Sequence, residues 1–292
     1  MPKVDVVVVA YNSRSHLRAA VQPLTKDDWV AVVVVDNASA DGSLETVADL
    51  HVRTIRLEHN GGFAHGCNTG WRDGEAPYVL FLNPDAVIDP ASVLRLASVL
   101  EEEPGVGIVA PKIVDSEGRV DISLRRFPRA RSTFAQALFL HRLFPRAAWV
   151  DEVVREPSAY ESPGSAGWVS GACLMLRRVQ LQELGGWDEG FFLYCEDIDI
   201  CRRVHAAGLE VRFDPAAVAV HAGGASHPRA ELLPVLAASR IRYAAKHGGV
   251  VASTVERTGV ALGALTHMLV GRGGARRGHA RAFTRALRRA ST

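Results

Sequence analysis

The stretch Val4-Asp5-Val6-Val7-Val8-Val9-Ala10 is a nearly continuous apolar run. Such a run is typical of a strand that is buried on both faces of a parallel sheet. Tyr11-Asn12-Ser13 then ends the run, and a helix to about Leu24 can begin there. A second apolar run, residues 30–35, ends at Asp36. The pattern predicts the start of a βαβ unit.

The same alternation continues toward the middle of the chain. We expect a helix near 43–50, a strand at 52–57, a glycine-rich loop at 60–70, and a strand at 78–82 that Asn83-Pro84-Asp85 ends. These elements predict an α/β fold with an open, doubly wound, mostly parallel sheet flanked by helices. Ligands of such sheets bind beyond the carboxyl ends of the strands, where the two aspartates and the glycine-rich loop fall.

The chain divides by composition into a main domain and an extension. We expect one α/β domain over residues 1–230, with an irregular, flexible, proline-containing insertion at 125–165. Residues 231–292 are expected to form a helical, basic extension. No signal peptide and no membrane-spanning segment are expected.

Charge and cysteine usage narrow the function classes. The net charge is +2, yet no acid follows Glu256, whereas eight arginines do. Such a tail suits an anionic membrane surface, with nucleic acid the less favoured partner. The four cysteines lack CxxC spacing, which favours reduced intracellular thiols over a structural zinc site.

The segment Glu196-Asp197-Ile198-Asp199 concentrates carboxylates beside apolar residues that include Phe191 and Phe192. Acids at a helix start are also favoured by the helix dipole, so a well-capped surface helix is the alternative. Mutual repulsion at an apolar wall raises the pKa of at least one carboxyl group. The segment is therefore a candidate for the proton acceptor of a reaction.

Two further features could hold a divalent cation. A carboxylate in a tight turn, as in Asn83-Pro84-Asp85, binds hard cations through oxygen, although an ordinary Asx turn is the alternative. His221 closes another predicted strand, and an imidazole ligand would favour Mn²⁺ beside Mg²⁺. A dinucleotide-binding enzyme is excluded, because GxGxxG does not follow the first strand.

Taken in order, these motifs resemble family 2 glycosyltransferases of the GT-A fold. The resemblance covers about residues 4–221 and looks closest to the rhamnosyltransferase-like branch that builds bacterial cell-wall and surface polysaccharides. It is carried by Val9-Ala10-Tyr11-Asn12, Asp36 to Ser43, Asn60 to Gly70, Asn83-Pro84-Asp85, Trp168 to Ala172, Gly185 to Glu189, Phe191-Phe192, Glu196 to Asp199 with Arg203, and His221.

The resemblance implies a division of the domain and a role for each matching residue. Residues 1–110 would bind the nucleotide-sugar and 165–225 would hold the acceptor and the catalytic groups. Asp197 would be the catalytic base, with Glu196 beside it, and Asp85 and His221 would bind Mg²⁺ or Mn²⁺. Asn83 replaces the first aspartate of the family's DxD element and is a weaker ligand. The implied donor-binding residues are Tyr11, Asn12, Asp36, Asn60, Gly62, Asn68 and Asn83.

Contacts to the acceptor or the diphosphate are less defined. The candidates are Trp168, Trp187, Asp188, Asp199 and Arg203. The tryptophans could equally belong to the core, and Arg203 could pair with an acid on its own helix. In the tail, Arg277, Arg281, Arg285 and Arg288 share one helical face opposite an apolar one. This pattern favours a basic amphipathic helix on a membrane, with a disordered solubilising tail as the alternative.

The sequence thus predicts an inverting, metal-dependent glycosyltransferase that is cytoplasmic and peripheral at the inner membrane face. The implied donor is a nucleotide-diphosphate sugar, dTDP-rhamnose within the suggested branch, and the acceptor a saccharide or a polyprenyl-diphosphate-linked sugar. Inversion needs one base and a charge-stabilising cation, whereas a hydrolase needs two facing carboxylates. A nucleotidyltransferase, which needs a lysine-bearing glycine loop that is absent here, and a non-catalytic nucleotide-sugar or lipid-binding protein are the alternatives.

Overall fold

The computed structural model describes residues 3–144, 147–221 and 229–288. The chain divides into two compact units. Unit 1 comprises residues 1–125, 155–190 and 196–226, and unit 2 comprises 126–154, 191–195 and 227–292. The segment expected as one insertion at 125–165 is therefore shared, because its first part groups with the C-terminal segment.

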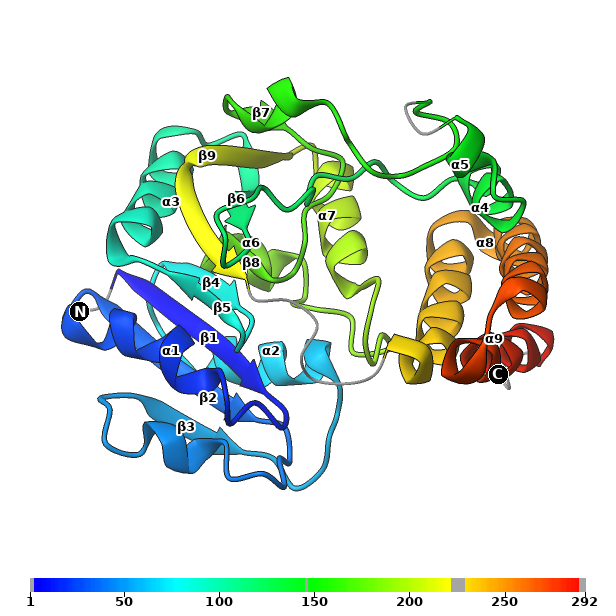
Figure 1. Cartoon of the computed structure of the whole chain (residues 1–292). Helices are drawn as coiled ribbons and strands as arrows, with labels where there is room; N and C mark the ends of the chain where they lie inside the picture. Colours follow the sequence, from blue (N-terminus) through cyan, green and yellow to red (C-terminus); the bar gives the residue numbers. More distant parts are fainter. Residues whose placement is uncertain (1–2, 145–146, 222–228, 289–292) are drawn as a thin grey trace. The chain divides into compact units, whose positions relative to one another are not determined.

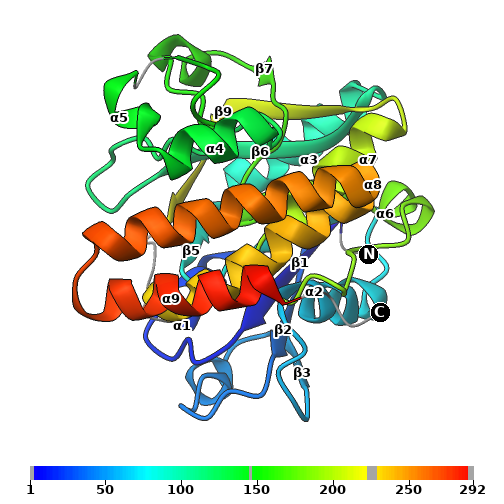
Figure 2. The same ribbon diagram turned by 90° about the vertical axis from the view of Figure 1, so that its right-hand side faces the viewer.

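Unit 1 is built on one mixed sheet (Figures 1 and 2). The strands lie in the order β3 (Arg53–Arg56), β2 (Val30–Asp36), β1 (Val4–Ala10), β4 (Tyr78–Leu82), β8 (Cys173–Arg177), β6 (Val106–Val114), β9 (Glu210–His221) and β5 (Ala86–Ile88), and β7 (Gly164–Ser165) pairs with β9. The first four strands are mutually parallel, as predicted. β8 is antiparallel to both neighbours, β6 is parallel to β9, and β5 and β7 are antiparallel to β9.

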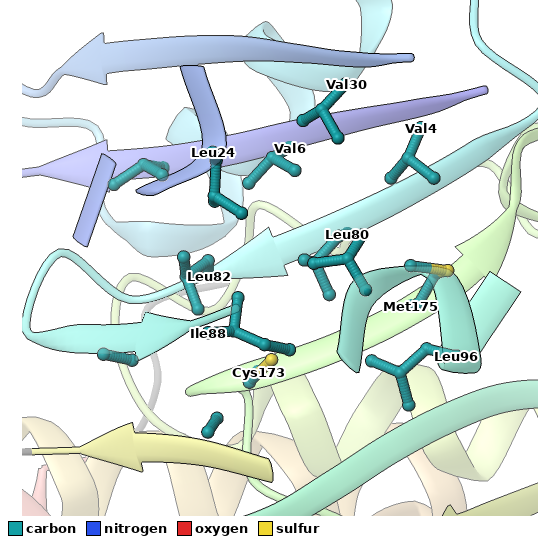
Figure 3. Packing of buried hydrophobic residues seen from close by; sticks show 14 of the residues in the cluster. Val4, Val6, Leu24, Val30, Leu80, Leu82, Ile88, Leu96, Cys173 and Met175 are labelled. Carbon is teal, nitrogen blue, oxygen red and sulfur yellow. The ribbon is translucent and has the colours of Figure 1, made fainter. Parts of the chain in front are cut away.

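The two faces of β1 pack against different helices, since side chains alternate along a strand. Val6 and Val8 belong to a core cluster with residues of α1 (Leu17–Val21) and α3 (Pro90–Glu102). Figure 3 shows this layer, with residues of β1, β2, β4, β5 and β8 pointing toward Leu24 and Leu96. Burial of these apolar side chains is the main favourable contribution to folding of unit 1.

The other face of β1 is covered by α2 (Phe63–Asp73), so most of the segment expected as a glycine-rich loop is helical. A Cβ atom on Gly66 would lie 2.5 Å from Val9 Cγ1, and one on Gly70 would lie 2.4 Å from Val7 Cγ1. The glycines therefore allow a close helix–strand contact. Only the stretch before Phe63 keeps the predicted loop conformation.

The remaining elements of unit 1 are short, apart from α7. They are the 3₁₀ turns η1 (Gln22–Lys26), η2 (Leu44–Val47) and η3 (Pro157–Tyr160), and the helices α6 (Arg178–Glu183) and α7 (Glu196–Ala206). The helix expected near 43–50 is thus a single 3₁₀ turn. The acidic segment does begin a helix, α7, as predicted.

Unit 2 is helical (Figure 2). It contains α4 (Ala130–Ala137), α5 (Leu140–Leu143), α8 (Arg229–Val270) and α9 (Gly273–Leu287). α8 is two helices joined at Gly249, whose φ of 70° is non-helical. Ala237, Ala264 and Ala282 form a small core between the halves of α8 and α9. The helical C-terminal region is as predicted, whereas the two helices inside the expected irregular insertion are not.

A buried ionic network holds unit 2 together. Arg240 forms ion pairs with Glu152 (2.9 Å) and Glu256 (2.7 Å), and Thr133 donates to Glu256 (2.8 Å). Burial alone would lower the pKa of the Arg240 guanidinium, but the two carboxylates raise it overall. The network joins α4, the stretch after α5 and both halves of α8, so residues 126–154 and the tail are one folded body.

Two expectations from composition can be compared with the structure. All four cysteines are free and buried. Among the residues that the structure describes, no helix is both long enough and apolar enough to cross a membrane.

Candidate active site at the strand ends of unit 1

Asp85 and His221 meet although 136 residues separate them in the chain. After β4, the chain turns through Asn83-Pro84-Asp85, where Ala86 N donates to Asn83 O (3.1 Å), and enters β5. β5 pairs with β9 so that Ala86 lies opposite His221. The Asp85 Oδ1 to His221 Nε2 distance is 3.1 Å. The two residues that the sequence suggests as metal ligands therefore face each other.

Asp85 and His221 each stabilise the charged form of the other. Burial raises the pKa of the Asp85 carboxyl, but its hydrogen bond with His221 and the charges of His221 and His16 lower it overall. The hydrogen bond with Asp85 raises the pKa of His221 against the effect of burial. His16, just before α1, had no predicted role.

The oxygen and nitrogen atoms of this pair are suitable ligands for a divalent cation. The remaining ligands of that cation would come from its substrate. Carboxylate oxygen with imidazole nitrogen suits Mn²⁺ better than Mg²⁺. The described parts of the chain contain no cluster of three His, Cys, Asp or Glu side chains arranged to hold a metal. A cation here would thus take further ligands from phosphate oxygens and water, as Mg²⁺ does in many phosphoryl-substrate sites.

Asp197 lies at the start of α7 and is held by backbone amides. Gly171 N donates to Asp197 Oδ2 (3.1 Å), and Ile198 N donates to Oδ1 (2.8 Å). The neighbouring Ala172 accepts through its carbonyl oxygen from Asn83 N (2.8 Å). The short stretch Gly171-Ala172, before β8, therefore ties the Asp85 turn to the candidate base.

Burial raises the pKa of Asp197 above its ordinary value, although the backbone hydrogen bonds and the charge of Arg125 oppose this effect. The direction agrees with the pKa increase predicted for one carboxyl group of this segment. Arg125 also pairs with Trp168 through two backbone hydrogen bonds (both 3.1 Å), and its guanidinium lies 6.0 Å from the Trp168 ring centroid. Sequence reasoning missed Arg125, because it falls at the edge of the segment expected as an insertion.

At the end of β2, Asp36 braces the loop that faces the end of β1. Ser39 N donates to Asp36 Oδ1 (3.1 Å), and Arg56 forms a longer ion pair with Asp36 (3.6 Å). Asn12 has a left-handed backbone (φ 50°), and its side chain accepts from Ala40 N (2.9 Å). Tyr11 is half-buried beside it. The strand ends that were predicted to bind the donor are thus joined to each other.

Asn37 extends this edge to the glycine loop and was not predicted. Its Nδ2 donates to Asn60 Oδ1 (2.9 Å) and Gly62 O (3.1 Å), and its Oδ1 accepts from Gly61 N (3.0 Å). Gly62 has a φ of 89°, which favours glycine, and precedes α2. The only sequence signal for Asn37 is its place directly after Asp36.

The environment of Asn68 favours a structural role over the predicted donor contact. Its Nδ2 donates to Trp187 O (2.9 Å) and to Glu189 Oε1 (2.7 Å). Its Oδ1 accepts from Trp71 Nε1 and from Trp187 N, both at 2.9 Å. The side chain is buried and all its hydrogen-bonding capacity is used. Asn68 thus fixes α2 to the stretch around Trp187.

We therefore expect Asn68→Ala to lower stability by about 2–3 kcal/mol, because it leaves buried donors without acceptors. Denaturant unfolding followed by tryptophan fluorescence measures this change. The dissociation constant for a nucleoside diphosphate, measured on the folded variant, should stay within about twofold of wild type. A large loss of nucleotide affinity without loss of stability would instead return Asn68 to the donor site.

The other acceptor and diphosphate candidates are mostly engaged inside unit 1. Trp187 is buried and packs edge-on against Phe81 (ring centroids 5.0 Å apart), which favours the core alternative. Arg203 pairs with the fully buried Asp199 on its own helix (2.8 Å) and donates to a backbone carbonyl oxygen, so its alternative is also favoured. Asp188 accepts from Gly190 N (2.8 Å). Glu196 is buried at the start of α7 and Trp168 is half-buried.

Comparison with known proteins agrees with this geometry. The family model "Glycosyl transferase family 2" matches residues 5–153. The chain is 30% identical over 231 residues to the N-acetylglucosaminyl-diphospho-decaprenol L-rhamnosyltransferase of Mycobacterium tuberculosis, covering 74% of this chain and 75% of that protein. It is 25% identical over 229 residues to rhamnosyltransferase WbbL of Escherichia coli, covering 75% and 83%.

Comparison with a solved structure establishes the fold. The mannosyltransferase PcManGT of Pyrobaculum calidifontis, in complex with GDP-Man and Mn²⁺, superposes with a TM-score of 0.56 at 18% identity, covering 98% of this chain and 81% of that one. The fold is therefore GT-A, as predicted. The chain belongs to glycosyltransferase family 2, and its relatives place it among rhamnosyltransferase-like enzymes of polysaccharide synthesis.

Proposed function

We propose that this glycosyltransferase moves L-rhamnose, with inversion, from a nucleotide-diphosphate donor to a polyprenyl-diphosphate-linked sugar in cell-wall synthesis. The names of the relatives from M. tuberculosis and E. coli support the sugar, and that of the former supports the lipid-linked acceptor. The observation that carries the mechanism is the link through Gly171 and Ala172 between Asp197 and the Asp85 turn. This link supports a mechanism in which one proton acceptor works beside one cation-binding pair.

In this proposal each group has one task. Asp197 accepts the proton of the acceptor hydroxyl as that oxygen attacks the anomeric carbon. Asp85 and His221 would hold Mn²⁺ or Mg²⁺, and the cation would supply positive charge for the diphosphate leaving group. The edge formed by Asp36 and Asn12 receives the nucleoside. Because the proposed acceptor is anchored in lipid, we place the enzyme peripherally at the inner face of the membrane.

The raised pKa of Asp197 predicts a pH dependence of turnover. Asp197 must be ionised to accept a proton, so activity falls as pH drops through its pKa. That acid limb of kcat/KM should lie above about pH 4, the ordinary aspartate value. The profile should be recorded at saturating metal, so that protonation of His221 does not contribute. An acid limb at or below the ordinary value would contradict the proposed environment of the base.

The donor is tested by binding. Thermal shifts with UDP, dTDP and GDP, each with and without Mn²⁺, should show the largest stabilisation for dTDP with Mn²⁺. A larger shift with another nucleotide would replace the rhamnose donor but retain the glycosyltransferase mechanism. No shift with any of the three would contradict a nucleotide-diphosphate donor.

A further inference from the structure

The two units carry opposite charge. Unit 2 contains 17 Lys and Arg against 4 Asp and Glu, a net charge of +13, whereas unit 1 contains 17 against 28, a net charge of −11. The overall +2 conceals this division. A strongly basic folded unit attracts polyanions through its summed field.

Two stretches without any acid meet within unit 2. Residues 126–150 and 257–292 contain no Asp or Glu. Thr266 Oγ1 donates to Ala137 O (2.7 Å), and the rings of Phe139 and His267 lie 4.3 Å apart. The end of α8 therefore packs beside the end of α4 and the residue that precedes α5, and Figure 2 shows α4 beside the second half of α8. The two basic segments therefore contact each other, although they are distant in sequence.

Large apolar side chains are exposed at this place. We define the tip as the exposed apolar residues of 138–149 and of the last turn of α8, namely Leu138, Leu143, Phe144, Trp149, Leu269 and Val270. At about 100° per residue, Leu269 and Val270 project within about 60° of the direction of Thr266, which contacts Ala137. The Phe144 and Trp149 rings lie 5.9 Å apart. The exposed apolar side chains of the tip thus belong to two segments that contact each other through Ala137 and Phe139.

Exposed arginines lie next to the tip residues along the chain. The Arg142 guanidinium lies 4.6 Å from the Phe139 ring centroid, and Arg272, Arg276 and Arg277 are exposed where α9 begins. The apolar face of α9 is less available than the sequence predicts, because Phe283 packs on the Ala237 cluster. Its arginines are exposed, apart from Arg289, which lies outside the described residues. Within the described part of unit 2, the tip gathers six exposed apolar side chains, and Val250, Val251 and Leu287 are exposed elsewhere.

We propose that the tip inserts into the interface of an anionic bilayer, with the nearby arginines on the lipid phosphates. Exposed aromatic and aliphatic side chains suit the acyl-chain region of such an interface, and nearby arginines suit its anionic headgroups. Self-association fits less well, because a two-fold interface would place the same arginines against each other. Membrane binding by the tip would serve the proposed transfer to a lipid-linked acceptor, so its biological purpose rests on that proposed function. Binding to vesicles itself needs no acceptor.

The test is cosedimentation of the full chain with vesicles of phosphatidylcholine and 30% phosphatidylglycerol. The tip variant Leu143→Gln/Leu269→Gln changes two exposed helical leucines (71% and 73% exposed). The matched control Val250→Gln/Val251→Gln changes two valines that are at least as exposed (83% and 77%) about 28 Å away along α8. The tip variant should bind at least about tenfold more weakly and the control within about twofold of wild type.

A second measurement reports on insertion itself. Brominated lipids should quench tryptophan fluorescence in the wild type, and Trp149→Phe should remove most of that quenching. Equal loss in tip and control variants, or binding unchanged by the tip variant, would overturn the proposal. So would a dimer that the tip variant converts to monomer, or equally tight binding to duplex DNA. Transfer to a short soluble acceptor should persist in the tip variant, which separates failure here from failure of the proposed function.

Discussion

Replacing Asp197 by asparagine should reduce kcat by about 10²–10⁴-fold while leaving the dissociation constant of the donor nearly unchanged. The substitution keeps the side-chain volume and an acceptor oxygen for the amide of Gly171 or Ile198, but removes the proton acceptor. Single-turnover kinetics with a lipid-linked or short soluble acceptor separates the chemical step from binding. The loss should therefore appear in turnover.

Asp199→Asn is a useful comparison, because this carboxylate is already paired with Arg203 and fully buried. It should lower stability, since it leaves a buried guanidinium without its charge partner. At a temperature where the variant is folded, it should retain much more turnover than Asp197→Asn. If Asp197→Asn kept turnover within threefold of wild type, the base would be elsewhere, with Glu196 the nearest alternative on α7.

Asp85→Ala should weaken nucleoside diphosphate binding at least about tenfold when Mn²⁺ is present. Even residues that only orient a metal ligand change metal affinity by about 10–100-fold, so loss of a ligand should do no less. With EDTA the variant and wild type should bind equally, because the carboxylate acts through the cation. Isothermal titration calorimetry under both conditions measures the difference.

His221→Ala should show the same metal dependence with a smaller loss, since a neutral imidazole contributes less charge than a carboxylate. Asp28→Ala is a matched control for charge alone, because Asp28 is exposed and precedes β2 at the opposite edge of the sheet. It should leave binding unchanged in both conditions. An equal loss for Asp85→Ala with EDTA present would contradict the metal role of the Asp85–His221 pair.

The parallel half of the sheet could be predicted because its signals are local. The valine runs of β1 and β2 and the run of β4 are buried on both faces, and each ends at a polar residue. The placement of Asp36 and Asp85 at the same edge follows from that topology. The start of α7 at Glu196 agrees with its acids, which the helix dipole favours in a first turn.

Features set by distant pairing could not be derived from local pattern. The Asp85–His221 contact depends on β5 pairing with β9. The sequence suggested both residues as cation ligands but did not predict this strand pairing. β9 is one strand, although Asp214-Pro215 interrupts its apolar run. The structure keeps one strand through a register shift against β6, and Asp214 is paired with Arg95. Asn68 was predicted to contact the donor, and its buried hydrogen bonds favour a structural role that Asn68→Ala tests.

The part of unit 2 near residues 126–154 was not predicted, because its prolines suggested irregular structure. Pro128 and Pro145 flank the α4–α5 segment and suggest an irregular insertion, yet the run between them includes Ala130–Ala137, which has good helix propensity. Its partner is the tail, more than 100 residues later, through Glu256 and Thr133. No local pattern indicates that such a pair of segments folds together.

The configuration of the new glycosidic bond tests the central claim most directly. The wild-type enzyme should be given dTDP-rhamnose, Mn²⁺ and a short acceptor that carries N-acetylglucosaminyl diphosphate, and the product examined by NMR through its one-bond anomeric C–H coupling. A single proton acceptor at Asp197 predicts an anomeric configuration opposite to that of the donor. A product that retains the donor configuration would contradict the mechanism.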